Sequence, residues 1–225
     1  MQLTYYGHAC FSVVVGGKTL LFDPFISGND KAQHVDIEQI KADYILQSHG
    51  HEDHIADLLP IAKRTGAKVV AMAEIAGWVQ AQGYDNVHAM NYGAVDMEFG
   101  EVRMVIAGHS SSLPDGSNGG NPAGFVIKPD EGSFYYAGDT CLMMDMQLIP
   151  RFATIDFAVM PIGGNFTMNA ADAIIASDFI KCDKIIGVHY DTWPPISIDK
   201  DKAKQAFTAA GKQLILPEIG ETLTV

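Results

Sequence analysis

The segment from residue 49 to residue 54, HGHEDH, places four potential metal ligands within six positions. Neutral imidazoles and carboxylates are common ligands of zinc and similar divalent ions. An H-x-H pair supplies two nitrogens that converge on one ion, and the adjacent Asp and His can turn toward a second ion. A solvated polar loop is the alternative interpretation, but turn formation does not require three histidines. The motif therefore predicts a metal site formed by His49, His51, Asp53 and His54.

Further ligands must come from other parts of the chain, because one metal ion needs three or four. His109, Asp139 and His189 each follow a short apolar segment with the composition of a β-strand. Strand ends of one sheet lie along a common edge, so these three side chains can meet the 49–54 motif in space. A water or hydroxide held between two divalent ions has a pKa close to neutrality, which makes metal-assisted hydrolysis the predicted chemistry.

Alternating strands and helices must position these residues. Apolar runs separated by glycine at 3–7, 10–17 and 18–25 predict consecutive antiparallel strands. A strand at 44–47 leads into the histidine motif, and helical spacing of apolar residues continues over 55–65 despite Pro60. Further strands are expected at 67–73, 87–90, 94–99, 101–109, 123–129, 133–139, 157–162, 184–189 and 213–217, and helices at 73–82, 169–180 and 199–211. This alternation predicts an α/β fold in a single domain, 1–225, with a surface loop from Ser110 to Asn121.

The composition restricts the partners of this chain. A formal net charge of -12 and only three arginines disfavour a nucleic acid, whereas metal ions would still let the site accept a small anionic substrate. No apolar stretch approaches the roughly 18 residues that span a bilayer, and no signal peptide is evident. Three scattered cysteines indicate a reducing compartment. We therefore expect a cytoplasmic protein that acts on a small molecule without nucleic-acid or membrane partners, and a homo-oligomer is compatible with the sequence.

The combination of HGHEDH, an isolated His109, the turn Gly138-Asp139-Thr140 and an isolated His189 resembles the metallo-β-lactamase superfamily along nearly the whole chain. The resemblance implies a four-layer αββα sandwich around two metal ions. It assigns His49, His51 and His109 to the first ion, Asp53, His54 and His189 to the second, and Asp139 to a bridging position. The segments YGHACF at 6–11 and PIGGNFTM at 161–168 resemble the ascorbate-6-phosphate lactonase-like branch of metal-dependent hydrolases.

Other candidate residues have less specific signals. Asp53 and His8 are the candidate catalytic residues; His8, at the end of the first predicted strand, is equally compatible with a substrate contact, a proton donor or a structural histidine bonded to backbone. Cys141 is expected to be a buried inert thiol rather than a ligand. The candidate substrate-binding residues are Gly164, Asn165 and Thr167, with a simple turn before a helix as the alternative.

The complete ligand set favours a hydrolase that uses a metal-bridging hydroxide to attack a small ester, lactone or phosphoester. Two alternatives stay open: an iron-dependent oxidoreductase of the same superfamily, and a metal-binding sensor without turnover. Flavodiiron proteins carry a glutamate in place of the second histidine, whereas His51 is present here. Histidine and carboxylate ligands accept several metals, so zinc or manganese is expected, and nickel or iron is compatible.

Overall fold

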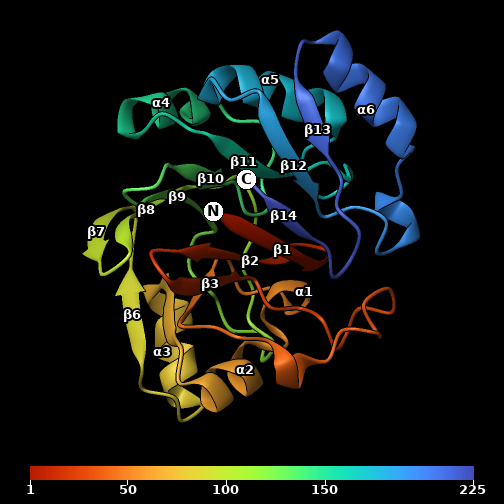
Figure 1. The fold of residues 1–225 in the computed structure, drawn as a ribbon. Coiled ribbons are helices and arrows are strands. Elements are labelled where there is room, and N and C mark those ends of the chain that lie inside the picture. The colour runs from red at the N-terminus through yellow and green to blue at the C-terminus, as the bar shows by residue number, and fades with distance from the viewer.

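Two seven-stranded β-sheets face each other in the middle of the molecule (Figure 1). The computed structural model describes residues 1–225. The strands of the first sheet lie in the order β14-β1-β2-β3-β4-β5-β6. Their bounds are β1 Gln2–Gly7, β2 Cys10–Val15, β3 Lys18–Phe22, β4 Tyr44–Gln47, β5 Lys68–Met72, β6 Val87–Met90 and β14 Thr222–Thr224. The strands from β14 to β3 pair antiparallel and those from β3 to β6 pair parallel, so this sheet is mixed.

The second sheet repeats this plan with the other half of the chain. Its strands lie in the order β13-β12-β11-β10-β9-β8-β7. Their bounds are β7 Gly93–Met97, β8 Gly100–Ile106, β9 Ala123–Lys128, β10 Phe134–Tyr136, β11 Phe157–Pro161, β12 Lys184–Val188 and β13 Gln213–Ile215. The strands from β7 to β10 pair antiparallel and those from β10 to β13 pair parallel, so each half begins with hairpins and ends with crossover connections.

Helices cover the outer face of each sheet and complete four layers (Figure 1). The helices beside the first sheet are α1 Glu52–Ile55, α2 Leu58–Thr65 and α3 Ala73–Ala81, and those beside the second are α4 Ile149–Phe152, α5 Ala170–Ile180 and α6 Lys200–Ala209. Short 3-10 helices lie at η1 Ile37–Gln39, η2 Met144–Leu148 and η3 Pro194–Ile196. The expected αββα sandwich is confirmed. None of the helices combines the length and the apolar character that crossing a bilayer requires.

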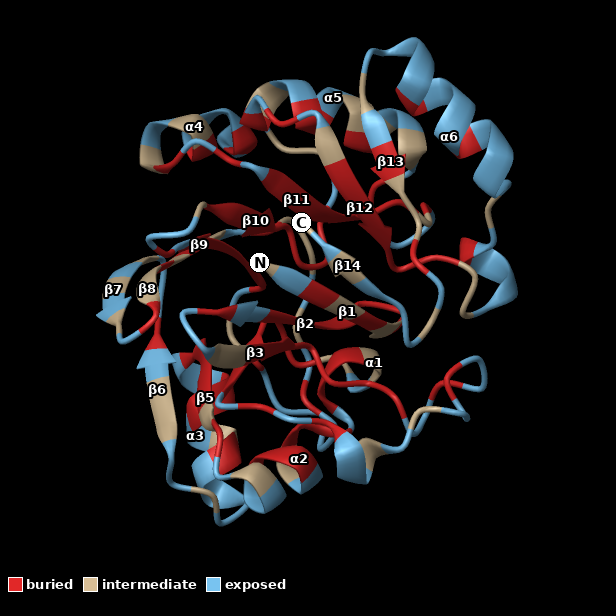
Figure 2. Ribbon diagram, viewed as in Figure 1, coloured by how far each residue is buried: buried red, intermediate tan, exposed pale blue.

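The core lies between the sheets and beneath the helices, as the buried strands in Figure 2 show. Successive side chains of a strand point to opposite faces of its sheet, and strand β10 shows how they are divided between the space between the sheets and the space beneath the helices. Phe134 and Tyr136 belong to the larger hydrophobic cluster, which includes the side chains between the two sheets. Tyr135, between them in the chain, packs in the smaller cluster beneath the helices of the second sheet. Phe22 of the first sheet contacts Tyr136 of the second with ring centroids 5.5 Å apart. Aromatic packing of this kind holds the two halves together.

Most of the expected elements are present, and the differences have local causes. The helix expected over 55–65 begins at Glu52 and divides into α1 and α2. Strand β14 was not expected, because three residues of mixed polarity carry no recognisable period; it forms by antiparallel pairing with β1. The segment from Ser110 to Asn121 is irregular, as expected, although Leu113 within it is buried in the core.

Candidate metal centre

The ligand candidates follow strands of both sheets at one edge of the sandwich. His49 lies two residues after β4, and His189 directly follows β12. His109 and Asp139 lie three residues after β8 and β10, respectively. Helix α1 is a single turn that carries Asp53 on the same segment as the histidines of the HGHEDH motif. The sheet edges therefore bring together residues that are up to 140 positions apart, from His49 to His189.

His49, His51 and His109 form a first group of imidazoles. Their ligand nitrogens all lie within 4.8 Å of one another. The Nε2 of His49 is 3.1 Å from the Nδ1 of His51, and the ring of His109 lies 5.2 Å from that of His49 between centroids. Three nitrogens directed at one point match the ligand count of a metal ion that keeps an open position for water or substrate.

Asp53, His54 and His189 belong to a second group, which also includes His8. The Oδ2 of Asp53 is 3.8 Å from the Nε2 of His54 and 3.8 Å from the Nε2 of His189. The side chains of His54 and His189 are almost fully buried, whereas that of Asp53 is 27% exposed. Asp53 therefore lies on the solvent-facing side of this group.

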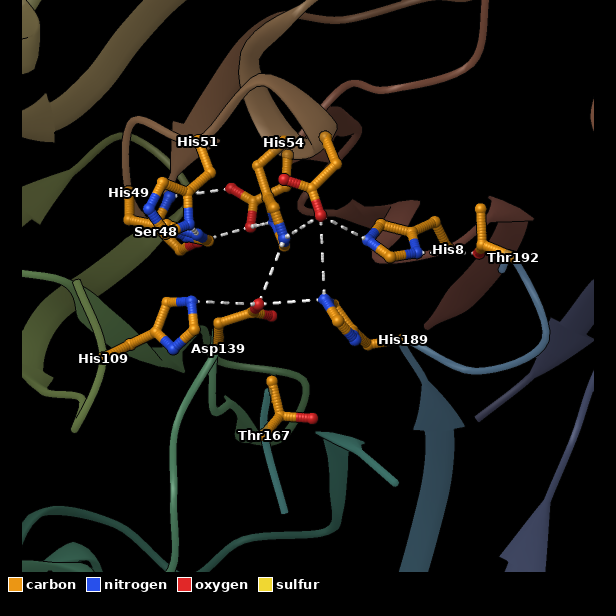
Figure 3. A network of polar contacts seen from close by, with 12 residues as sticks. His8, Ser48, His49, His51, His54, His109, Asp139, Thr167, His189 and Thr192 are labelled. Atoms are coloured by element: carbon orange, nitrogen blue, oxygen red, sulfur yellow. Dashed lines mark hydrogen bonds and ion pairs between the residues drawn. The ribbon is translucent and has the colours of Figure 1, made fainter. Parts of the chain in front are cut away.

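Asp139 connects the two groups (Figure 3). Its Oδ2 is 3.6 Å from the Nε2 of His109 in the first group. The same oxygen is 3.4 Å from the Nε2 of His54 and 2.9 Å from the Nε2 of His189 in the second group. One carboxylate oxygen thus faces nitrogens of both groups, which makes Asp139 a candidate for a ligand shared between them.

The unpartnered atoms of this centre fit divalent cations. The Nε2 of His54 and the Oδ1 of Asp139 are buried and have no hydrogen-bond partner. Buried polar atoms without a partner are rare, and a bound ion is one of the explanations that such atoms require. Because both atoms are lone-pair donors of the types that zinc and manganese accept, the donor set fits the metal ions that the sequence predicts.

The electrostatics of the centre agree with that fit. Burial lowers the pKa of His49 well below its usual value, and burial also lowers the pKa of His51, so both rings are neutral donors at neutral pH. Burial opposes ionisation of Asp139, but the nearby His189 and His54 hold its pKa well below the usual range. The pKa of His54 is raised well above its usual value because Asp139 and Asp23 outweigh burial. The position facing His54 is therefore one at which positive charge is stabilised.

Asp23 is a functional residue that the sequence analysis missed. It is fully buried, and its Oδ2 accepts hydrogen bonds from the Nδ1 of His54 at 2.8 Å and from the hydroxyl of Tyr136 at 2.6 Å. Ser48 donates both its backbone N–H and its hydroxyl to the same carboxylate. A carboxylate that holds the Nδ1–H of a histidine leaves the Nε2 free for a metal and orients the ring.

Ser48 extends this network to the first group, because its hydroxyl also lies 2.9 Å from the Nδ1 of His49. One buried carboxylate thus orients a ligand of each group. The sequence signal was an aspartate at the end of the third strand, DPF at 23–25, which equally indicates an ordinary turn. Only the folded chain shows that Asp23 meets His54 and Tyr136, which lie 31 and 113 residues away.

The ring of His8 lies beside Asp53 and bonds to side chains rather than to backbone. Its Nε2 is 3.1 Å from the Oδ2 of Asp53, and its Nδ1 is 2.8 Å from the hydroxyl of Thr192 (Figure 3). Burial and the nearby His189 lower its pKa to about 4, so the ring is neutral at neutral pH. The carboxylate must accept, so the Nε2 of His8 donates to Asp53 and Thr192 donates to Nδ1. This arrangement orients Asp53.

The candidate substrate-binding residues occupy a turn beside Asp139 and His189. The turn is attached to the centre by the hydrogen bond from the N–H of Met168 to the carbonyl of Thr140, at 2.9 Å. Thr167 lies near Asp139 and His189 (Figure 3). Gly164 and Asn165 shape the turn with positive φ angles of 69° and 57°, which favour glycine and asparagine. Their role in substrate binding stays a prediction.

No hydrogen bond joins the thiol of Cys141 to the ligand candidates, and it belongs to none of the groups above, so it is not counted as a ligand. The expectation that its thiol is buried was wrong, because its side chain is exposed in the loop after Asp139. The apolar residues that follow Cys141 in the sequence do not reveal that this loop runs over the surface.

The loop from Ser110 to Asn121 contacts the HGHEDH segment. The hydroxyl of Ser110 is 3.3 Å from the Nε2 of His51, and the hydroxyl of Ser111 accepts from the N–H of Gly50 at 3.1 Å. An added Cβ at Gly50 would lie 3.1 Å from the side chain of buried Leu113. The loop therefore packs against the metal-binding segment and occupies the Nε2 of His51, which leaves its Nδ1 directed toward the first group.

Replacing His109 by alanine is expected to lower the metal content by about one ion per chain, because the first group loses one of its three imidazoles. Inductively coupled plasma mass spectrometry of the purified protein measures this stoichiometry. His88→Ala is the matched control, since His88 lies on β6 and belongs to no ligand group. Unchanged stoichiometry in the His109 variant would remove this residue from the ligand set.

A protein-family model and several known proteins are similar to this chain along most of its length. A family model described as a β-lactamase superfamily domain matches residues 2–189. A UPF0173 metal-dependent hydrolase from Christiangramia forsetii is 53% identical over 225 residues, and the alignment covers 99% of each chain. A protein of the same description from Flavobacterium johnsoniae is 50% identical over 224 residues, with 99% of each chain covered.

Solved structures show the same fold. A metallo hydrolase from the hyperthermophilic archaeon Ignicoccus hospitalis superposes with a TM-score of 0.90 and 33% identity, covering 100% of this chain and 97% of the other. An isothiocyanate hydrolase from Delia radicum gut bacteria superposes with a TM-score of 0.81 and covers 100% and 99% of the two chains. Its identity is 17%, so this second similarity concerns the fold alone.

Proposed function

Because this chain is a metal-dependent hydrolase that belongs to the metallo-β-lactamase superfamily, we propose that it holds two divalent ions and hydrolyses a small ester, lactone or phosphoester. The ions are zinc or manganese. The substrate is a small molecule, and neither a nucleic acid nor a membrane takes part. A net charge of -12 supports this choice, since a chain of this net charge repels a polyanion.

The position of Asp139 is the observation that carries the proposal. Its Oδ2 lies within 3.6 Å of His109 in one group of ligands and within 2.9 Å of His189 in the other. A mononuclear site would need no carboxylate between the groups. Two ions that share one ligand lie close enough to act on the same substrate bond.

The residues of the centre have distinct roles in hydrolysis. When bound, the two ions would activate water as a nucleophile near neutral pH and polarise the attacked carbonyl or phosphoryl oxygen. Asp23 and Ser110 hold the ring nitrogens of His54 and His51 that do not face the centre. Asp23, Asp53 and Asp139 contribute three negative charges against the four positive charges of two divalent ions, so the loaded centre would keep a positive field that stabilises an oxyanion.

The carboxylate of Asp53 is partly exposed, whereas His54 and His189 are buried, so we infer that substrate reaches the centre from the side of Asp53. His8 donates its Nε2–H to this carboxylate and thereby holds its orientation. His8 itself is held by the hydroxyl of Thr192 and by the rings around it, including that of Trp193 at 5.0 Å between centroids. Asp53 therefore meets an incoming water or substrate in a fixed geometry, which lowers the entropic part of the barrier.

Removing the metals tests this function. Dialysis against a chelator is expected to abolish hydrolysis in a screen of lactones, carboxylic esters, phosphodiesters and thioesters, and adding zinc or manganese is expected to restore it. Asp53→Ala is expected to reduce the rate about 100-fold or more by weakening the second group, whereas Glu52→Ala is the matched control because Glu52 is exposed on the same helix turn.

The outcomes of the screen separate the alternatives. Full activity in the metal-free protein would contradict a metal-dependent mechanism. Two tightly bound ions without turnover of any compound would instead favour a sensor or a redox enzyme on the same fold. Metal content and activity are therefore measured on the same preparation.

A further inference from the structure

His8 and Thr192 line a cavity of about 390 Å³, and the metal-ligand candidates take no part in its wall. The wall combines the end of β1, the loop between β3 and η1, the loop between β12 and α6, and the segment between β13 and β14. A cavity of this size is typical of a site for a small molecule. We infer that this cavity binds a small oxyanion such as a phosphate group, held by Lys31, Lys200 and the side-chain amide of Asn29.

Two lysines of the wall provide positive charge for an oxyanion. Lys200, the first residue of α6, is held in place, because its Nζ is 3.4 Å from the Oδ2 of Asp191 and 5.4 Å from the ring centroid of Tyr190. The lysines that form ion pairs in this chain do not include Lys31. A lysine ammonium binds phosphate as a point charge. The charge of Lys31 is therefore not compensated by a carboxylate and is free for an anion.

Asn29 contributes a buried hydrogen-bond donor to the same wall. Its side chain is buried, with 1% of the residue exposed. The Oδ1 accepts from the backbone N–H of Lys31 at 3.0 Å, which fixes the direction of the amide, whereas the Nδ2 has no hydrogen-bond partner. This Nδ2 lies close to Gly7, the residue before His8, where an added Cβ would be 2.8 Å from it. Buried donors without a partner are rare, and an oxygen of a bound anion would supply the partner.

Two carboxylates of the wall oppose the binding of an anion, and one of them is compensated. The Oδ2 of Asp191 pairs with Lys200, and its Oδ1 accepts from the backbone N–H of Ile198 at 2.9 Å. Glu218 is exposed and forms no ion pair, so its charge remains. The binding of an oxyanion thus depends on Lys31 and on the free amide of Asn29 rather than on an excess of positive charge. Removing the charge of Glu218 should act in the opposite direction to removing that of Lys31.

The cavity is linked to the metal centre by a chain of hydrogen bonds. The hydroxyl of Thr192 is 2.8 Å from the Nδ1 of His8, and the Nε2 of His8 is 3.1 Å from the Oδ2 of Asp53 (Figure 3). An anion in the cavity therefore lies against residues that orient Asp53. The oxyanion belongs either to the substrate that is hydrolysed or to a separate small molecule, and the same side chains recognise it in both cases.

Isothermal titration calorimetry of the metal-loaded protein with inorganic phosphate tests the cavity. Lys31→Ala is expected to weaken phosphate binding about tenfold, because it removes the uncompensated charge. Glu218→Gln is expected to strengthen binding about threefold, because it removes a repelling charge and keeps the shape of the side chain. Lys41→Ala is the matched control, since Lys41 is also exposed and lies outside the cavity.

Asn29→Asp tests the buried amide in the same titration. It keeps an oxygen for the N–H of Lys31 and replaces the free donor by an acceptor, so phosphate binding is expected to weaken about 100-fold or more. Lys31 and Glu218 are exposed, so their variants carry the test even if Asn29→Asp does not fold.

Opposite shifts in the Lys31 and Glu218 variants, with an unchanged Lys41 control, are the expected result. Equal phosphate affinity in these three variants and the original protein would overturn the cavity as the binding site, because phosphate held by the metal ions does not depend on Lys31 or Glu218. Absence of phosphate binding to the original protein would overturn it as well. These measurements need no turnover, so they are independent of the proposed hydrolysis.

Two chromogenic esters identify the source of the oxyanion. The mono-4-nitrophenyl ester of adipic acid carries a terminal carboxylate, whereas 4-nitrophenyl hexanoate has an acyl chain of the same length without it. A preference for the adipate of about tenfold in kcat/KM that Lys31→Ala removes would assign the oxyanion to the substrate. Equal kcat/KM for both esters, with a kcat that changes when phosphate is added, would assign it to a separate ligand. Phosphate binding that depends on Lys31, without hydrolysis of either ester, would support the cavity and contradict ester hydrolysis.

Discussion

The Asp139→Ala protein is expected to lose at least one of the two metal ions that we propose for each chain, and about 1,000-fold or more of its hydrolytic activity. The Oδ2 of Asp139 faces both groups of imidazoles, at 3.6 Å from the Nε2 of His109 and 3.4 Å from the Nε2 of His54. Without it, the two groups lose the ligand that we propose they share, and the carboxylates of Asp53 and Asp23 would compensate the charge of the ions less well. Metal content by mass spectrometry and the initial rate of hydrolysis measure the two effects.

A matched control distinguishes this effect from a general loss of charge. Asp145 lies six residues further along the chain and is exposed on η2, so Asp145→Ala is expected to keep both the metals and the rate. Asp139→Asn adds a second comparison, since it preserves the shape of the side chain but removes the bridging charge. A variant at Asp139 that binds two ions and hydrolyses substrate at the normal rate would exclude a bridging role.

The Asp23→Asn protein is expected to bind metal about 10- to 100-fold more weakly and to lose about 2 to 4 kcal/mol of unfolding free energy. The carboxylate of Asp23 accepts from His54, Ser48 and Tyr136 and donates to none of them. An asparagine must direct an N–H toward one of these donors, which leaves a buried hydrogen bond unmade. The ring of His54 then loses the partner that directs its Nε2 at the metal.

Asp57→Asn is the control for Asp23→Asn. Asp57 is also buried, and its carboxylate accepts from the backbone N–H groups of Ile26 and Ser27 at 2.6 and 2.8 Å, but it does not contact a histidine. Its replacement is expected to lower stability without the same loss of metal affinity. Chemical denaturation gives the stability, and competition with a chromogenic chelator gives the affinity. Equal loss of affinity in both variants would mean that Asp23 acts only through stability.

The resemblance carried by the HGHEDH motif and three isolated residues predicted the sandwich and all seven ligand candidates that the structure brings together. Local patterns account for the strands and helices, because strand alternation and helical spacing depend on neighbours along the chain. The four layers and the assignment of the ligands to two ions were implied by the resemblance. The expected positions of His109, Asp139 and His189 after strands agree with the structure for the same reason. The exposed Cys141 and the unexpected β14 show the limit of this approach, since each depends on contacts with distant segments.

The sequence by itself determined which side chains are able to bind metal and which elements carry them, because residue type and periodicity are local properties. Tertiary structure alone decided that Asp23 orients His54 and that Asp139 faces both groups of imidazoles. These arrangements depend on distances between atoms from separate strands and loops. Such distances are set by how the two sheets pack, and no spacing along the chain encodes them directly.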